Sequence, residues 1–99
     1  MTRQVVIKGL AIADLDGIYR FGVETWGQQR AGAYIQAIDG LFTLLAEQPE
    51  IARERHDIDP PVRLHPYRSH LVIFRAEDAS LDVLRIVHAR SDWRALLGE

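Results

Sequence analysis

The spacing of apolar residues in the first half of the chain predicts two helices joined by a glycine. Between residues 11 and 26 apolar side chains recur every three or four positions, the period of one helix face. The same spacing continues from residue 28 to residue 48, and Pro49 then ends it. Gly27 lies between the two patterns, where we expect a left-handed cap. Such a short junction predicts an antiparallel helical hairpin.

Short runs of β-branched and apolar residues predict strands on both sides of this hairpin. Residues 4–8 form the first run, and the last two strands are nearly continuous apolar runs, which indicates a central position in a sheet. The polar stretch 50–61 ends in two prolines and predicts an irregular connection. Ser91-Asp92 is a candidate cap for a short final helix over residues 93–97. The remaining predicted strands are residues 62–67, 69–75 and 81–88.

This order of elements predicts an α+β fold in a single domain over residues 1–99. We expect the helical hairpin to pack on a mostly antiparallel sheet, with the N-terminal strand at an edge and a short C-terminal helix. Gly17 and Gly22 each weaken the first helix by about 1 kcal/mol relative to alanine. Both therefore predict a close approach of the neighbouring helix.

Composition narrows the chemistry without identifying it. The chain has no cysteine, and its four histidines stand at positions 56, 65, 70 and 88 on different predicted elements, so we expect neither a disulfide nor a metal site, and no cofactor. The longest apolar run, residues 41–46, is too short to cross a membrane, which predicts a cytoplasmic protein. The net charge of −2 lacks the basic excess of a nucleic-acid-binding protein. We therefore expect no specific DNA binding by the chain alone, although its arginines can still form a local basic face.

Four segments of the chain carry recognisable motifs, namely Tyr34–Ile38 with Leu44–Glu50, Arg53–Ile58, Tyr67–Arg75 and Leu84–Trp93. In this order and spacing they resemble the ParE branch of the ParE/RelE superfamily. Ala52 departs from the glycine that the family has at this place. The resemblance implies the α+β fold described above and the toxin half of a type II toxin–antitoxin pair.

The resemblance implies a ParD-like antitoxin that forms a hetero-oligomer with the toxin, and DNA gyrase as the target. The first alternative is a RelE-like mRNA endonuclease that acts on the ribosome, for which Arg85, His88 and Arg90 are the candidate catalytic residues. The second alternative is a binding module of the same fold without toxicity. The acidic balance and the lack of Tyr, His or Lys after Trp93 argue against the nuclease. With Arg68 and Trp93, the same three residues are the candidates for target binding.

Several of these residues also have a purely structural interpretation. Arg85 is expected to pair with an acid such as Asp82 or Asp57, and Asp92 with Arg90. For His88, a structural role with a hydrogen bond to the backbone is at least as expected as a functional role. Trp26 is expected in the core, and Arg53 and Arg55 in a solvated charged loop.

The antitoxin site is expected on the helical hairpin. Antitoxins of this type bind through a segment that is disordered alone and folds on binding, with an amphipathic helix laid in a groove. Arginines offer bidentate contacts to the carboxylates of such a segment. The candidates for the groove are the less buried apolar residues of the two helices, Ile12, Tyr19, Phe21 and Leu44.

Overall fold

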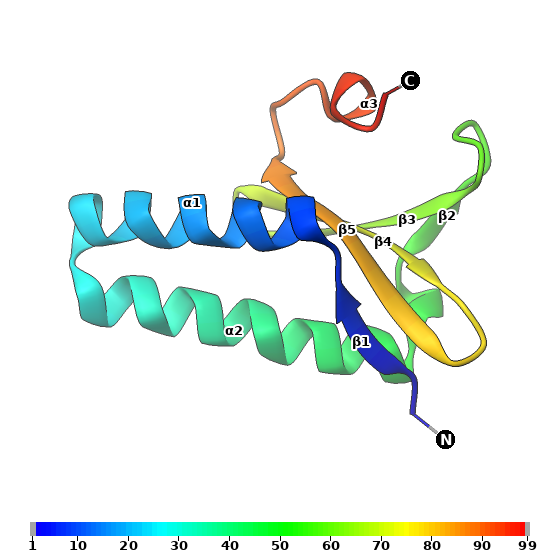
Figure 1. Cartoon of the computed structure of the whole chain (residues 1–99), viewed down its shortest axis with the longest axis horizontal. Helices are drawn as coiled ribbons and strands as arrows, with labels where there is room; N and C mark the ends of the chain where they lie inside the picture. Colours follow the sequence, from blue (N-terminus) through cyan, green and yellow to red (C-terminus); the bar gives the residue numbers. More distant parts are fainter. Residues whose placement is uncertain (1, 99) are drawn as a thin grey trace.

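The protein folds into two helices packed on one face of a five-stranded sheet, as Figure 1 shows for a computed structural model that describes residues 2–98. The two long helices run antiparallel to each other, and their joined end extends beyond the sheet. The elements are β1 (Gln4–Ile7), α1 (Gly9–Trp26), α2 (Gln28–Glu47), the 3-10 turn η1 (Pro49–Ile51), β2 (Arg53–Arg55), β3 (Val62–Tyr67), β4 (His70–Ala76), β5 (Ser80–His88) and α3 (Trp93–Leu96).

The sheet has the strand order β1-β5-β4-β3-β2. β1 pairs in parallel with β5, and the other three pairings are antiparallel. The α+β class, the edge position of the first strand and the central position of the last two strands are therefore confirmed. The prediction of an irregular connection over residues 50–61 was wrong in part, because η1 and β2 lie within it. β2 is only three charged or polar residues long, so no apolar alternation marks it.

Glycines shape the hairpin at two points. Gly27 has φ 95° and ψ 165°, a region essentially restricted to glycine, rather than the left-handed helical conformation we predicted. Its N–H donates to the carbonyl of Val23, and its carbonyl accepts from Ala31, so one residue ends α1 and begins α2. A Cβ on Gly22 would lie 3.0 Å from that of Ala31, which confirms a close approach there. Gly17 has no such neighbour, so the same prediction for it was wrong.

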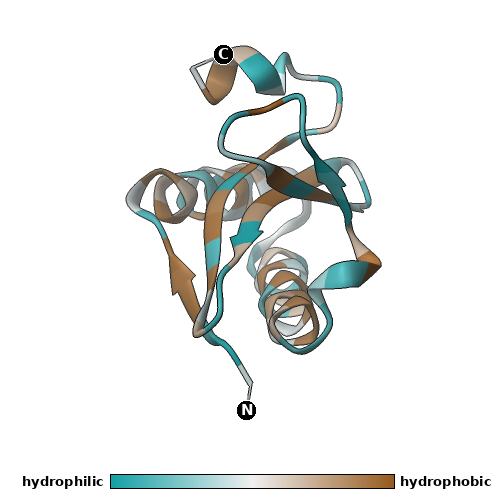
Figure 2. Cartoon of the chain, turned by 90° about the vertical axis from the view of Figure 1, so that its right-hand side faces the viewer, coloured by the Kyte–Doolittle hydropathy of each residue, from teal (hydrophilic) through white to brown (hydrophobic). Residues whose placement is uncertain are grey.

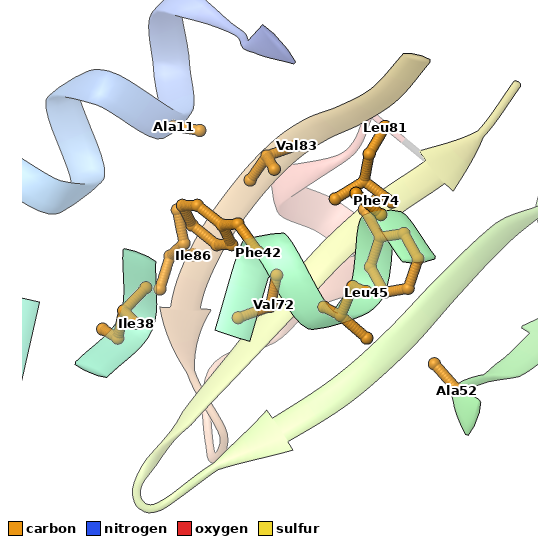
Figure 3. Close-up of a cluster of buried hydrophobic side chains, with 11 residues drawn as sticks. Ala11, Ile38, Phe42, Leu45, Ala52, Val72, Phe74, Leu81, Val83 and Ile86 are labelled. Carbon is orange, nitrogen blue, oxygen red and sulfur yellow. The ribbon is translucent and has the colours of Figure 1, made fainter. Parts of the chain in front are cut away.

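The main core lies between the hairpin and the sheet. Phe42 and Phe74 are its largest fully buried side chains, and Figure 3 shows side chains of α2 meeting those of β4 and β5 there. Each such large apolar side chain contributes about 1.5–3 kcal/mol on burial. This core fixes α2 on the sheet. Its labelled members in Figure 3 are Ala11, Ile38, Phe42, Leu45, Ala52, Val72, Phe74, Leu81, Val83 and Ile86.

A second, smaller core covers the other face of the sheet. Ile58, in the connection after β2, packs with Val62, Ile73 and Val87, and Trp93 at the start of α3 packs against them. The centre of the Trp93 ring lies 5.2 and 5.1 Å from the Cζ atoms of Arg55 and Arg94. Asp57 forms ion pairs with both arginines. The C-terminal helix is therefore held by apolar contact and by a charged cluster.

The two edge strands differ in character. Figure 2 shows β1 as mainly apolar, whereas β2 has the sequence Arg-Glu-Arg. Charged side chains on an edge strand discourage pairing with further strands. Within residues 2–98, no helix has the length and apolar character needed to span a membrane.

Candidate functional site

A cleft of about 930 Å³ opens between the helical hairpin and the ends of β3, β4 and β5. Its helical walls carry small side chains where the two helices face the opening, at Gly17 on α1 and at Ala33 and Ala37, one turn apart, on α2. A Cβ added at Gly17 would meet nothing within 4 Å. The cleft therefore exists because small residues stand where larger ones would fill the space.

Exposed aromatic residues line the cleft near the tip of the hairpin. Phe21 is 61% exposed and Trp26 51%, and their rings meet edge to face with centroids 6.0 Å apart. The guanidinium of Arg30 lies over the Trp26 ring. The prediction that Trp26 belongs to the core was wrong, because this end of the hairpin extends beyond the sheet and has nothing to pack against (Figure 1). Large exposed apolar side chains beside a cleft indicate a surface that another molecule covers.

The opposite end of the cleft, at the sheet, is polar and aromatic. The hydroxyl of Tyr34 on α2 is 2.8 Å from Nδ1 of His70 on β4, and the Tyr34 ring also meets Tyr67 edge to face at 5.5 Å. The rings of His70 and His88 have centroids 5.9 Å apart. Burial raises the pKa of Tyr34, and burial followed by the nearby His88 lowers the pKa of His70. His70 therefore favours its neutral form in the free protein.

Arg68 stands in the two-residue turn between β3 and β4 and lines the same end of the cleft. Its φ of 54° lies in the left-handed region that non-glycine residues rarely adopt. Its guanidinium lies 5.7 Å from the centre of the Tyr67 ring, and no acid of residues 2–98 pairs with it. Strained residues of this kind are concentrated at functional sites. Arg68 is therefore a candidate contact for an anionic ligand.

Arg85 has a different position and a complete set of partners. Its Nε and Nη2 atoms donate to the two carboxylate oxygens of Asp14 on α1 at 2.7 and 2.9 Å, and Asp14 also accepts from the backbone N–H of Ile86 at 2.9 Å. The side chains of this pair are only 16% and 14% exposed. Hydrogen bonding to Asp14 raises the pKa of Arg85. A third bond runs from Nη1 to the carbonyl of Leu96 at 3.3 Å.

The predicted partners of Arg85 were therefore wrong. Asp82 accepts a hydrogen bond from Ser80, and Asp57 pairs with Arg55 and Arg94. Asp14 instead reaches the edge of β5 beyond the last residue paired with β1, where it replaces the missing strand as an acceptor. Arg85 thus joins α1, β5 and α3.

The remaining residues considered near the end of the chain, His88, Arg90 and Asp92, do not form one group in the structure. Nδ1 of His88 accepts from the backbone N–H of Arg90 at 3.1 Å, which is the backbone-bonded alternative, while its ring also lines the cleft. Arg90 is exposed and is not part of the cleft lining. Asp92 does not pair with Arg90 as predicted. Its side chain caps α3 by accepting a hydrogen bond from the N–H of Ala95 at 3.4 Å, which confirms the prediction of a helix cap at Ser91-Asp92.

The family model for the ParE toxin of type II toxin–antitoxin systems of the parDE type matches residues 5–93, which contain both the cleft and the Asp14–Arg85 pair. The chain belongs to the ParE toxin family.

Several proteins named as ParE toxins are similar over nearly the whole chain. Toxin ParE3 of Caulobacter vibrioides is 30% identical over 86 residues, 87% of this chain and 86% of the relative. Toxin ParE1 of the same organism is 27% identical, covering 89% and 91%, and toxin ParE1 of Mycobacterium tuberculosis is 27% identical, covering 93% and 95%. A solved structure of a chromosomal ParDE system from P. aeruginosa superposes with a TM-score of 0.74 at 25% identity, over 88% of this chain and 96% of that one.

The four residues expected to bind the antitoxin do not lie on one surface of this ParE fold. Phe21 lines the cleft, but Ile12 and Tyr19 are about 160–180° away around α1, on its opposite flank. Leu44 is exposed and follows Ala37 by seven residues, so it extends the cleft flank of α2. Of the residues expected to bind the target, only Arg68 and His88 line the cleft, whereas Trp93 packs on the far face of the sheet.

Sequence reasoning missed the small residues and the polar partners that form this ParE cleft. Ala33 and Ala37 carry the signal of small side chains one turn apart, but such a pair is also common on an ordinary helix face. The contact between Tyr34 and His70 joins residues 36 positions apart, which no local pattern indicates. Among residues 2–98, no three His, Asp or Glu side chains lie together as metal ligands would.

Proposed function

We propose that a ParD-like antitoxin neutralises this toxin by laying an amphipathic helical segment in the cleft, and that the toxin acts in the cytoplasm on DNA gyrase. The observation that carries the antitoxin site is the cleft itself, with its small-residue walls, exposed aromatic side chains at one end, and two arginines, Arg30 and Arg68, that lie over aromatic rings. An amphipathic helix provides the apolar side chains for such walls and polar groups for its rim. The ParDE system of P. aeruginosa, which has the same fold, supports a partner of the ParD type.

Membership of the ParE family supports gyrase as the target, and the geometry supports a role without catalysis. Arg85, one of three candidate catalytic residues, is engaged by Asp14 and the carbonyl of Leu96. Arg90 lies outside the cleft lining, and Nδ1 of His88 already accepts a backbone hydrogen bond. Metal-free RNA cleavage needs an acid, a base and cations around one phosphate. The residues first suspected therefore do not form such a group.

One observation favours mRNA cleavage as a second candidate function. His70 and His88 have ring centroids 5.9 Å apart and share the cleft with Arg68. Two imidazoles beside an arginine are the groups that acid–base cleavage of RNA uses. This set includes only one of the three residues that the sequence suggested, namely His88.

Two assays of the purified toxin, freed of antitoxin, separate these functions. We expect it to inhibit supercoiling of plasmid DNA by gyrase and to leave mRNA intact in a translating extract, with antitoxin reversing the inhibition. Cut mRNA with normal supercoiling would replace the gyrase proposal by the nuclease. If the toxin changes neither supercoiling nor mRNA but still binds antitoxin when it is added, the protein is a binding module without toxicity.

The antitoxin site is tested by two matched substitutions on opposite flanks of α1. Phe21→Ala is expected to weaken antitoxin binding by about thirtyfold, the effect of an aromatic residue central to an interface. Ile12→Ala removes an apolar side chain of nearly equal exposure, 57% against 61%, and is expected to leave the affinity unchanged. Binding is measured by titration calorimetry. A loss with Ile12→Ala and none with Phe21→Ala would place the antitoxin on the other flank.

A further inference from the structure

The sheet end of the cleft carries positive and hydrogen-bond-donating groups without an acid to match them. Arg68, His70 and His88 line it. Asp14 is the one acidic residue along the lining that the structure describes, and both of its oxygens are engaged by Arg85 and the N–H of Ile86. The whole chain has a net charge of −2, so this local excess of cations is opposite in sign to the average. A ligand group that complements this end of the cleft is an anion.

The two imidazoles are held so that one ring nitrogen of each remains for a ligand. Nδ1 of His70 is bonded to the hydroxyl of Tyr34 at 2.8 Å, and Nδ1 of His88 accepts from the N–H of Arg90 at 3.1 Å. Because Nδ1 of His88 is an acceptor, its proton in the neutral form is on Nε2, which makes that atom a donor. The free Nε2 atoms and the guanidinium of Arg68 are thus the groups available to an anion.

We infer that the sheet end of the cleft is a carboxylate-binding subsite, in which His70, His88 and Arg68 bind one Asp or Glu side chain of the antitoxin segment. The inference rests on the proposed function, because it assumes that the antitoxin occupies the cleft. The remaining lining favours a peptide over RNA. Gly17, Ala33 and Ala37 form apolar walls, which suit the side chains of a helix better than a chain of phosphates.

A carboxylate at this position links binding to protonation. In the free toxin, burial and His88 keep the pKa of His70 below its ordinary value, so His70 is neutral at neutral pH. The charged groups around it are Arg68 and, when protonated, His88. Burial raises the pKa of Tyr34 and so keeps it neutral, Tyr67 contacts the Tyr34 ring, and Asp14 is engaged elsewhere. A bound carboxylate favours the protonated imidazole and raises the pKa in the complex. Proton uptake therefore accompanies binding, and the affinity rises as the pH falls through the pKa in the complex toward the lower pKa of the free toxin.

The test uses a ParD-like antitoxin as an intact protein, titrated into the toxin at about pH 8 and about pH 6. These values lie on either side of the ordinary histidine pKa of about 6.5. Wild-type toxin is expected to bind about tenfold more tightly at the lower pH, the effect of a pKa one unit higher in the complex. Calorimetry in buffers of different ionisation enthalpy should record the proton uptake directly.

Two variants and a control assign the effect to the subsite. His70→Gln combined with His88→Gln should remove most of the pH dependence and the proton uptake. His56→Gln changes an exposed histidine that pairs with Glu54 outside the cleft, and it should behave as the wild type does. Arg68→Gln, at an exposed position, should weaken binding at both pH values, so the subsite stays testable if the double variant folds poorly.

The outcomes separate the subsite from the wider proposal. Tight antitoxin binding with no pH dependence in the wild type, or with the dependence intact in the double variant, would overturn the carboxylate subsite and leave the cleft as the antitoxin site. No antitoxin binding by any form would overturn both. Binding of single-stranded oligouridylate that needs the same two histidines and is displaced by antitoxin would replace the carboxylate by a phosphate.

Discussion

The junction at Asp14 and the sheet end of the cleft both lie along the last part of β5, yet their charges are arranged in opposite ways. At the junction the carboxylate and guanidinium groups bind each other, a backbone N–H and a backbone carbonyl. In the cleft Arg68 lies over the face of Tyr67 with no acidic partner among residues 2–98, and the imidazoles of His70 and His88 meet each other. Matched charges hold elements together, whereas unmatched ones are available to a partner. Residues with the same side chain, Arg85 and Arg68, therefore have different roles.

Asp14→Ala should have the largest effect on the junction. It leaves Arg85 largely buried without its acid and the N–H of Ile86 without an acceptor, which should lower the free energy of unfolding by about 3 kcal/mol. Asp16→Ala breaks the exposed pair with Arg20 on the same helix and should cost less than about 0.5 kcal/mol. Urea unfolding of the two variants measures the contrast. Equal losses would mean that the buried pair is not structural.

Arg68→Gly should move stability and affinity in opposite directions. Glycine adopts the φ of 54° without steric cost, so the free energy of unfolding should rise by up to about 1 kcal/mol. Antitoxin affinity should fall several-fold, because the cation is lost. Arg68→Ala removes the same cation and keeps the strain, so its affinity should fall equally without the gain in stability. Thermal unfolding and calorimetry of both variants measure the two quantities. A gain in affinity with Arg68→Gly would contradict the role in binding.

Asp57, Arg55 and Arg94 form a cluster over the far face of the sheet. Its opposite charges pair with each other, as they do at the Asp14 junction, but the cluster is exposed. We therefore expect the smallest effect on stability from changes there. Hydrogen bonds from Arg55 and then Arg94 lower the pKa of Asp57 from 3.8. The folded state therefore binds this proton more weakly than the unfolded state does. The stabilisation is complete above about pH 5 and is lost as the pH falls below 4.

Asp57→Asn should flatten this acid dependence. The fall in unfolding temperature between about pH 6 and about pH 3 is expected to be smaller in the variant than in the wild type. Asp39→Asn, a matched change at an exposed position of α2, should keep the wild-type dependence. An unchanged acid dependence in the Asp57 variant would show that the cluster adds nothing to stability.

The fold could be predicted because its main elements bury long apolar patterns. α2 and the central strands β4 and β5 carry continuous signals, since their side chains meet in one core. β2 carries none, because it pairs only with β3 and has three charged residues. Trp26 continues the apolar stripe of α1 to its end. A pattern along one helix does not reveal where the sheet beneath that helix stops.

The site was less predictable because it depends on contacts between distant positions. The partner of Arg85 is 71 residues away, and Asp14 looks like an ordinary polar residue of an amphipathic helix. The cleft results from missing side chain volume at Gly17, Ala33 and Ala37, and hydrophobic periodicity does not record volume. The family resemblance suggested both Arg68 and Arg85 as site residues, but it could not distinguish Arg85, which holds the fold, from Arg68, which faces the cleft.

The parallel pairing of β1 with β5 also sets an order of events during synthesis. Residues 4–7 leave the ribosome early, yet their partners at 80–83 are added more than seventy residues later. The contacts between α1 and α2 are local in sequence, so the hairpin can form while the chain is still growing, whereas the sheet must wait, since contacts between distant residues form slowly. His70 and His88 belong to those late strands. The rings of His70 and His88 can therefore meet only after residue 88 has been added, so the sheet end of the cleft is among the last parts of the molecule to take shape.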